Sequence, residues 1–287
     1  MRDLTPRPPL PSPPRHPGEG EPETEKQDSQ RAGTVSPLSR GKGGRWERGA
    51  RGVRFFAFLL VLSAFPALAA DVRPDAPEAD FREFNRRFAM AAYHYPRHGA
   101  APLGLIGFDV YADAAVDQDF GDEAFVGTVL DDDLTGDVLA VIRVGARKGL
   151  PAGINIGLSY GRALETDIDL VSADLQWAIL EGGLLAPALS LRLTGTRSMG
   201  SDVYDLDQYG AELLFSKGFT VLTPYVGAGI VRSEGSLESS LGRTFEDSET
   251  RGVVYGGITL NLLLPKITVE VEKADVVQGA VRVAFGL

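Results

Sequence analysis

From Leu103 onward the chain alternates apolar and polar residues with a period of two, which is the pattern of β-strands. In the first such segment, Ile106, Phe108 and Val110 alternate with Gly107 and Asp109. Ten segments share this pattern, and they begin near residues 106, 138, 154, 171, 189, 208, 225, 254, 267 and 277. Many are close to the ~9–11 residues that a tilted strand needs to cross a bilayer.

The two faces of these segments differ in charge as well as in polarity. The apolar face is nearly free of charge, whereas the polar face carries charged residues in mid-strand. Apolar residues turned towards lipid around a polar centre are typical of membrane barrels, because lipid permits strands only in a closed sheet. We therefore predict an all-β fold, a closed antiparallel up-and-down transmembrane β-barrel of about ten strands (between ~8 and ~12), over residues 101–287.

The pattern assigns individual side chains to the inside and the outside of this barrel. Buried charges must be paired, so the inward ones are expected to form a salt-bridge network. Its expected members are Asp109, Asp113, Arg143, Arg147, Asp174, Arg192, Glu212, Glu270, Glu272 and Arg282. The aromatic residues expected to face lipid are Phe108, Tyr160, Trp177, Tyr209, Phe215 and Phe285.

The connections between the expected strands alternate in length. Short turns are expected at Lys148–Gly153, Glu181–Gly183, Lys217–Phe219 and Pro265–Lys266, and long polar loops at Asp117–Gly136 and Ser233–Gly252. Short turns at one end and long loops at the other are typical of outer-membrane barrels, in which an even strand number leaves both barrel termini in the periplasm. A soluble β-sandwich or a lipocalin-like barrel shows the same alternation and remains the structural alternative.

The first 70 residues have a different character. Half of the 18 prolines fall within residues 1–37, and no apolar periodicity runs through this region, which predicts a disordered Pro-rich extension over residues 1–52. A basic flank, the uncharged run from Phe55 to Phe65 and the Ala67-Leu68-Ala69 site then predict a signal peptide over residues 53–70, cleaved after Ala69 or Ala70. Such a signal normally follows the start codon closely, so residues 1–52 are interpreted as a start assigned too far upstream.

Residues 71–100 are expected to form a periplasmic N-terminal segment that contains a short amphipathic helix. Phe81, Phe84 and Phe88 share one face at helical spacing. Two interpretations are open: the helix packs under the barrel, or it acts as a plug or a docking element for a partner.

Several motifs resemble those of known proteins. Thr223-Pro224-Tyr225-Val226-Gly227-Ala228-Gly229 resembles a Pro-Tyr-x-Gly-x-Gly strand of small outer-membrane barrels, and Ala101–Asp109 and Leu180–Gly183 resemble a family of uncharacterised proteobacterial outer-membrane barrels of the small OmpA/OmpW-like class. The resemblance covers most of residues 78–287. The run Val281, Val283, Phe285, Leu287 is similar to the signal read by the barrel-assembly machinery, although it ends in leucine rather than an aromatic residue.

Composition narrows the possible functions. The net charge of −10 argues against nucleic-acid binding, and a chain without cysteine has neither disulfides nor thiolate metal sites. The three histidines are His16, His94 and His98, so residues 99–287 hold none. Phospholipase, lipid A deacylase, palmitoyltransferase and omptin barrels resemble one another in using a histidine on the barrel, so an enzyme is not expected here. No cofactor, metal site or catalytic residue is predicted.

We therefore expect a monomeric, porin-like outer-membrane protein of a Gram-negative bacterium that contacts membrane lipid and lipopolysaccharide. Its role is expected to be structural or that of a narrow, cation-preferring pore. One alternative is a surface interaction protein that uses acidic extracellular loops, whose carboxylates include Asp131, Asp132, Asp133, Asp137, Glu238, Glu246, Asp247 and Glu249. A barrel enzyme that acts on lipid or peptide is a more remote alternative.

Overall fold

The computed structural model describes residues 70–121, 123–131, 138–183, 185–262 and 264–286. The predicted extension at residues 1–52 and the predicted signal peptide, apart from Ala70, lie outside these residues. Asp132, Asp133 and Asp137 of the expected acidic loop also lie outside them.

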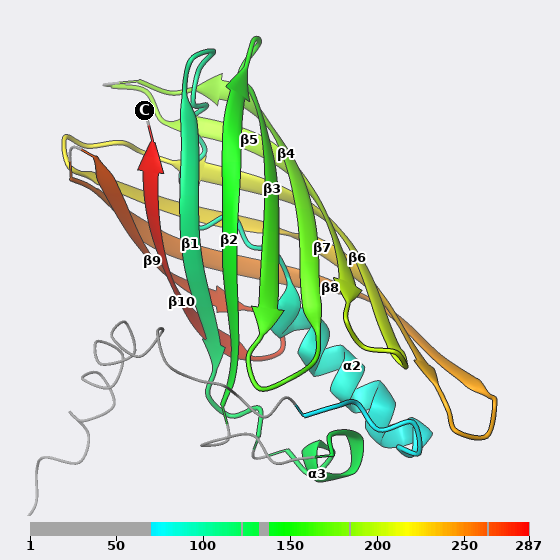
Figure 1. Ribbon diagram of the computed structural model, residues 1–287. Coiled ribbons are helices and arrows are strands. Elements are labelled where there is room, and N and C mark those ends of the chain that lie inside the picture. Colours follow the sequence, from blue (N-terminus) through cyan, green and yellow to red (C-terminus); the bar gives the residue numbers. More distant parts are fainter. Residues whose placement is uncertain (1–69, 122, 132–137, 184, 263, 287) are drawn as a thin grey trace, which may run out of the picture. The chain divides into compact units, whose positions relative to one another are not determined.

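Ten antiparallel strands form a closed up-and-down barrel, so the predicted fold class is confirmed (Figure 1). The strands are β1 (Phe108–Asp117), β2 (Leu139–Leu150), β3 (Ile154–Ala163), β4 (Asp169–Glu181), β5 (Ala188–Met199), β6 (Tyr204–Ser216), β7 (Leu222–Glu238), β8 (Thr244–Asn261), β9 (Pro265–Lys273) and β10 (Val277–Gly286). Each strand pairs with its neighbours in sequence, and β1 pairs with β10 to close the ring, with Asp113 opposite Arg282.

Two helices accompany the barrel in the part of the chain that the structure describes. Helix α2 (Glu78–Ala92) precedes β1, and the short helix α3 (Val126–Val129) lies in the connection between β1 and β2. Among the described residues, no helix is long and apolar enough to cross a membrane.

The two ends of the barrel differ. We call the end that holds the first residue of β1 and the last residue of β10 the short-turn end, and the opposite end the long-loop end. The β1–β2 connection with α3 lies at the long-loop end, and so does the tip of the β7–β8 hairpin, which extends well beyond the neighbouring strands (Figure 1).

Buried and exposed residues alternate along the strands in the sense expected for a membrane barrel. In β3 and β4 nearly every second residue is buried in the interior, and the residues between them are exposed. The exposed set includes large aliphatic side chains such as Val144, Leu158 and Ile230, each more than half exposed. A barrel that turns its aliphatic residues outward and its charged residues inward has the opposite arrangement to that of a water-soluble protein.

The expected long loop at Ser233–Gly252 is wrong for most of its length. β7 and β8 continue as a paired hairpin through this region, with Glu238 opposite Thr244. Residues on both faces of these strands are polar, so the sequence shows no apolar–polar alternation there. Helix α2 nevertheless contacts the inner face of the hairpin: Asn85 of α2 donates to Asp247 of β8 at 3.1 Å. The expected turn at Pro265–Lys266 is likewise the first part of β9, where these residues pair with β10 and β8.

The interior has an apolar half and a polar half. At the long-loop end, Phe81, Phe84 and Phe88 of α2 are wholly buried and pack on a cluster that includes Phe120, Phe125 and Tyr204. Inward residues of the surrounding strands complete this apolar core, namely Leu139, Val141, Leu170, Leu206, Val231, Leu237 and Val253. The charged residues lie towards the short-turn end. At the long-loop end, α2 closes the barrel by apolar packing of the kind found in a hydrophobic core.

A charge on the outward face tests its contact with lipid. Val144 lies near the middle of β2 and is 58% exposed, so Val144→Arg is expected to lower the free energy of unfolding in lipid vesicles by about 2–4 kcal/mol, the typical cost of arginine at mid-bilayer. Leu241→Arg is the matched control: Leu241 is 81% exposed in the turn of the β7–β8 hairpin, and a change of at most about 0.5 kcal/mol is expected there. Equal small effects at both positions would contradict a lipid-facing barrel wall.

Candidate functional site

The structure brings the predicted interior charges together. All ten residues of the expected network are at most 5% exposed. The six aromatic residues expected to face lipid are between 43% and 57% exposed on the outer surface, and the three phenylalanines of the predicted helix face are 0% exposed. The ten charged residues thus lie inside the barrel wall and the six aromatic residues on its outer surface.

The charged interior is not an open channel, because the chain itself passes through it. Residues Tyr93–Gly107, here called the lumen segment, connect the end of α2 to the start of β1. Tyr93 already has the extended backbone angles φ −63° and ψ 139°, and Pro96 favours an extended conformation in the residue before it. At the other end, Ala100 donates to Ser216, the last residue of β6, at 2.8 Å.

Barrel side chains bind the main chain of the lumen segment and the end of α2 along its whole path. Arg143 donates to the carbonyl of Ala92 at 2.6 Å, Arg192 to that of His94 at 2.8 Å, and Arg282 to that of Pro96 at 3.0 Å. Further bonds of this kind join Gln208 to Ala89, Gln176 to Ala100 and Asn155 to the amide of Leu103. Since a buried carbonyl without a partner is costly, these bonds are what allow an extended segment to lie inside the barrel.

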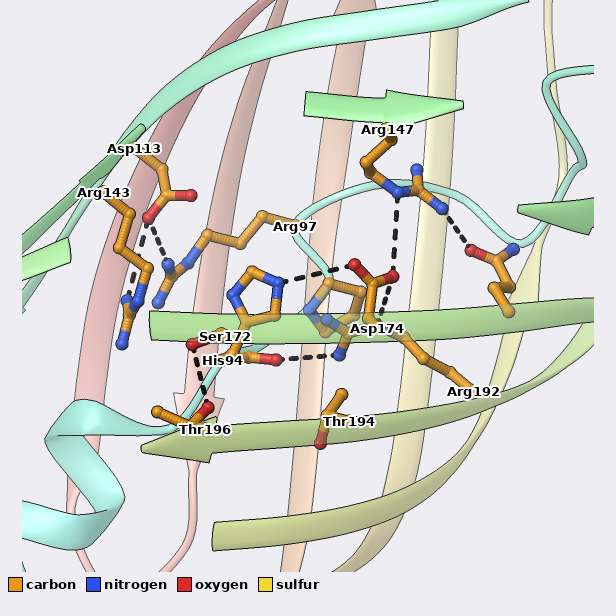
Figure 2. Close-up of polar contacts among 12 residues, drawn as sticks. His94, Arg97, Asp113, Arg143, Arg147, Ser172, Asp174, Arg192, Thr194 and Thr196 are labelled. Atoms are coloured by element: carbon orange, nitrogen blue, oxygen red, sulfur yellow. Dashed lines mark hydrogen bonds and ion pairs between the residues drawn. The ribbon is translucent and has the colours of Figure 1, made fainter. Parts of the chain in front are cut away.

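Arg97 is the central cation of the lumen segment. Its guanidinium lies 2.5 Å from Asp113 and 2.8 Å from Glu272, and 3.9 Å from Glu270 (Figure 2 shows the contact with Asp113). Its backbone angle φ of +48° lies in the left-handed region, which costs a non-glycine residue about 1–2 kcal/mol. Ion pairing between the Arg97 guanidinium and the three carboxylates offsets this cost, because each buried charge needs a partner of the opposite sign.

A second cluster surrounds Asp174 of β4. Arg192 lies 3.3 Å from its carboxylate, Arg147 3.8 Å and the His94 ring 3.7 Å (Figure 2). Arg192 also reaches Glu212 at 3.1 Å, and Glu212 in turn accepts hydrogen bonds from the hydroxyls of Tyr93 and Tyr255. The lumen segment is thus part of the network on this side as well.

Sequence reasoning missed four members of this interior. Arg97 and His94 were not assigned to it, because a segment that precedes the first strand carries no sign that it enters the barrel. Lys266 was assigned to a turn, yet it donates to Asp109 at 2.8 Å. The ring of Tyr111 was also missed, and the Arg282 guanidinium lies 3.6 Å from its centre. The only available signal was the run Tyr93–His98, in which aromatic and basic residues follow an amphipathic helix without a polar linker.

The expected position of the helix beside the barrel termini is wrong, and so is the expected position of the two histidines outside the barrel. Helix α2 lies at the long-loop end, where Arg87 pairs with Asp117, the last residue of β1. His94 is 2% exposed inside the barrel, and the partners of Ala100 place His98 close to the short-turn end. The physical reason is that the apolar helix face finds its partners among the inward residues of the long-loop half.

Electrostatics hold α2 to the connection after β1. Burial lowers the pKa of Arg87, but its hydrogen bond to Asp117 and the charges of Asp117 and Glu123 outweigh this effect, so the pKa lies above its ordinary value. Arg87 therefore stays charged, and it fastens the helix to β1 and to the loop that carries α3.

A polar cleft of about 620 Å³ opens at the long-loop end between β6, the β7–β8 hairpin and α2. Half of its lining residues are acidic, and the lining consists of Arg82, Asp205, Asp207, Arg232, Glu234, Gly235, Ser236, Glu246, Asp247 and Ser248. Among the described residues, no group of three or more histidine, aspartate or glutamate side chains is arranged to hold a metal ion.

Similarity to known proteins is found among solved structures. No known family model matches the chain, and no curated protein matches it. Among solved structures, it is similar to the N-terminal β-barrel domain of OprF from Pseudomonas aeruginosa, at 12% identity and a TM-score of 0.32 over 64% of this chain and 99% of that one. It is also similar to the outer membrane protein Omp33 of Acinetobacter baumannii (8% identity, TM-score 0.28, 66% and 99% covered) and to LpxR from Salmonella typhimurium (11%, 0.34, 61% and 99%).

The fold, the outward apolar belt and the charged interior define the class: a small β-barrel of the outer-membrane type. Within that class, this chain is a ten-stranded barrel whose interior is occupied by its own N-terminal segment. Because the sequence identities and TM-scores are low, any more specific property of this chain follows from its own residues.

The contribution of Arg97 is testable by removing its charge. Arg97→Met keeps a long unbranched side chain but removes the cation shared by three buried carboxylates, of which Asp113 then has Arg143 at 3.8 Å, so it is expected to lower the free energy of unfolding by about 3–5 kcal/mol. Arg197→Met is the control, since Arg197 is 69% exposed and 3.9 Å from Asp207, and an effect of at most about 1 kcal/mol is expected. Urea titration in detergent micelles or vesicles measures both, and equal effects would show that the lumen segment does not depend on this cluster.

Proposed function

We propose that this protein is an outer-membrane β-barrel of a Gram-negative bacterium with a closed lumen, whose barrel anchors the structured surface at its long-loop end. One observation carries the proposal: the lumen segment fills the polar half of the interior, and its carbonyls accept hydrogen bonds from Arg143, Arg192 and Arg282 of the wall. The role is structural rather than that of a conduit.

The alternative of a narrow pore is less well supported. The wall carries six of the predicted carboxylates and four of the predicted arginines, which would favour cations in an open channel. The same groups are engaged with one another and with Arg97, His94 and Tyr93 of the lumen segment. Conduction therefore requires the lumen segment to move.

An enzymatic role finds little support in the geometry of the interior. His94 lies 3.7 Å from Asp174, which resembles part of a catalytic arrangement. The nearby Ser172 is bonded to Thr196 at 2.9 Å, and the His94 side chain is 2% exposed, so a substrate has no access to it. The polar interior is better explained as the filling of a small barrel.

A second candidate function is interaction at the cell surface. It is favoured by the amount of ordered structure at the long-loop end, where α2, α3 and the β7–β8 hairpin pack together and where α2, β6 and the hairpin line the polar cleft. A closed barrel that carries such a surface suits a monomer set in lipid and lipopolysaccharide. Insertion by the barrel-assembly machinery is proposed on the basis of the C-terminal run that ends β10.

Conductance separates the closed barrel from the pore. The wild-type protein in planar bilayers is expected to give no steady single-channel steps. The double variant Tyr95→Gly and Arg97→Gly removes two wholly buried side chains from the lumen segment and is expected to give small, cation-preferring steps, because the wall then keeps its excess of carboxylates.

The control for this experiment is Arg73→Gly, since Arg73 lies before α2 and, within the described part of the chain, its side chain pairs with the exposed Asp75. It is expected to remain silent, like the wild type. Circular dichroism in the same detergent verifies that each variant keeps its strands. Steady steps from the wild-type protein would overturn the closed lumen and favour the narrow pore.

A further inference from the structure

The route of the N-terminal segment has a direction across the membrane. Residues 70–74 lie at the long-loop end, where they bond to three separate connections. Ala70 bridges to Thr166 between β3 and β4, Arg73 donates to Val129 between β1 and β2, and Ser240 of the β7–β8 turn donates to Pro74. All three connections lie at the end opposite to the first residue of β1.

The lumen segment then leads to the other end. Ala100 bonds to Ser216 and Gln176, which lie towards the ends of β6 and β4 at the short-turn end. Gly149, near the last residue of β2, donates to Gly107 just before β1 begins. The chain between Ala70 and Gly107 therefore passes once through the barrel, from the long-loop end to the short-turn end (Figure 1).

The path through the barrel is made by the helix and the extended part together. Tyr93 to Ala100 are eight residues, which span at most ~26 Å when fully extended. The bond from the Tyr95 amide to the Tyr93 carbonyl and the left-handed backbone of Arg97 shorten this span. Helix α2, which packs on inward residues of the long-loop half, covers the rest of the path, and the barrel wall separates the chain from lipid.

We infer that the N-terminal part of the folded chain, residues 70–92, lies on the outer surface of the cell and reaches it through the chain's own barrel. This inference rests on the proposed outer-membrane location, in which the long-loop end faces outward and both barrel termini face the periplasm. The chain end left by the predicted signal cleavage, at Ala70 or Asp71, is then displayed outside. The barrel thereby holds its own N-terminal segment at the outer surface of the cell, and α2 is part of that surface.

The absence of cysteine makes a labelling experiment clean, since the wild-type chain gives no signal with a maleimide reagent. Ala79→Cys and Ala101→Cys are matched alanine replacements at exposed positions on the two sides of the lumen segment. Leu241→Cys and Leu185→Cys mark the long-loop and short-turn ends, and these residues are 81% and 92% exposed. Intact cells are treated with a maleimide carried on a polymer too large for diffusion pores, and a second sample is treated after lysis.

The expected result is that Ala79→Cys and Leu241→Cys are labelled in intact cells, whereas Ala101→Cys and Leu185→Cys are labelled only after lysis. Labelling of Leu241→Cys without Ala79→Cys in intact cells would overturn the inference and leave the proposed location intact. Labelling of Ala101→Cys in intact cells would overturn the inference as well. If Leu241→Cys is labelled only after lysis, the proposed outer-membrane orientation itself fails.

Discussion

The structure depends on satisfying the main chain of a segment that has no strand partner. An extended segment inside a barrel can pair with no edge, because the ring of strands is closed, so its carbonyls must find side chains instead. The barrel supplies them at intervals along the path, with Arg143, Arg192 and Arg282 on the wall and Gln208 and Gln176 towards the two ends. Arg143 and Arg192 also pair with wall carboxylates, so the hydrogen bonds that hold the segment and the charge balance of the interior belong to one network.

This network divides the protein into two chemical environments along the barrel axis. Near the short-turn end, polar side chains bind a polar main chain, and geometry decides stability because each buried charge needs its partner in place. Near the long-loop end, Phe84 and its aromatic neighbours pack as in the core of a soluble protein. Their contribution to stability depends more on the apolar area that they bury than on the geometry of individual contacts. The helix therefore occupies the wide apolar half and the extended chain the polar half, which explains why helical structure ends at Ala92.

Much of the barrel could be predicted because alternation is a local property of the sequence. The side on which Asp113, Arg143 or Glu272 lies follows from its neighbours two residues away, and these assignments agree with the observed burial. The partners could not be predicted in the same way. Arg97 meets Glu272 across 175 positions of sequence, and Asn85 stabilises a hairpin that by itself shows the composition of a loop. Such contacts depend on where the apolar helix packs in the folded barrel, and no short stretch of sequence determines that position.

The closed ring around a continuous chain also constrains assembly. The seam of the barrel joins β1 to β10, the first strand to the last, so it forms only after the whole chain is available. Helix α2 has a diameter of about 10 Å with its side chains and sits at one mouth of an interior that is already filled. Once the seam has paired, the helix is too wide to be drawn back through the polar half. The N-terminal segment must therefore be in place before the seam closes, and it then leaves only if the seam opens or the helix unwinds.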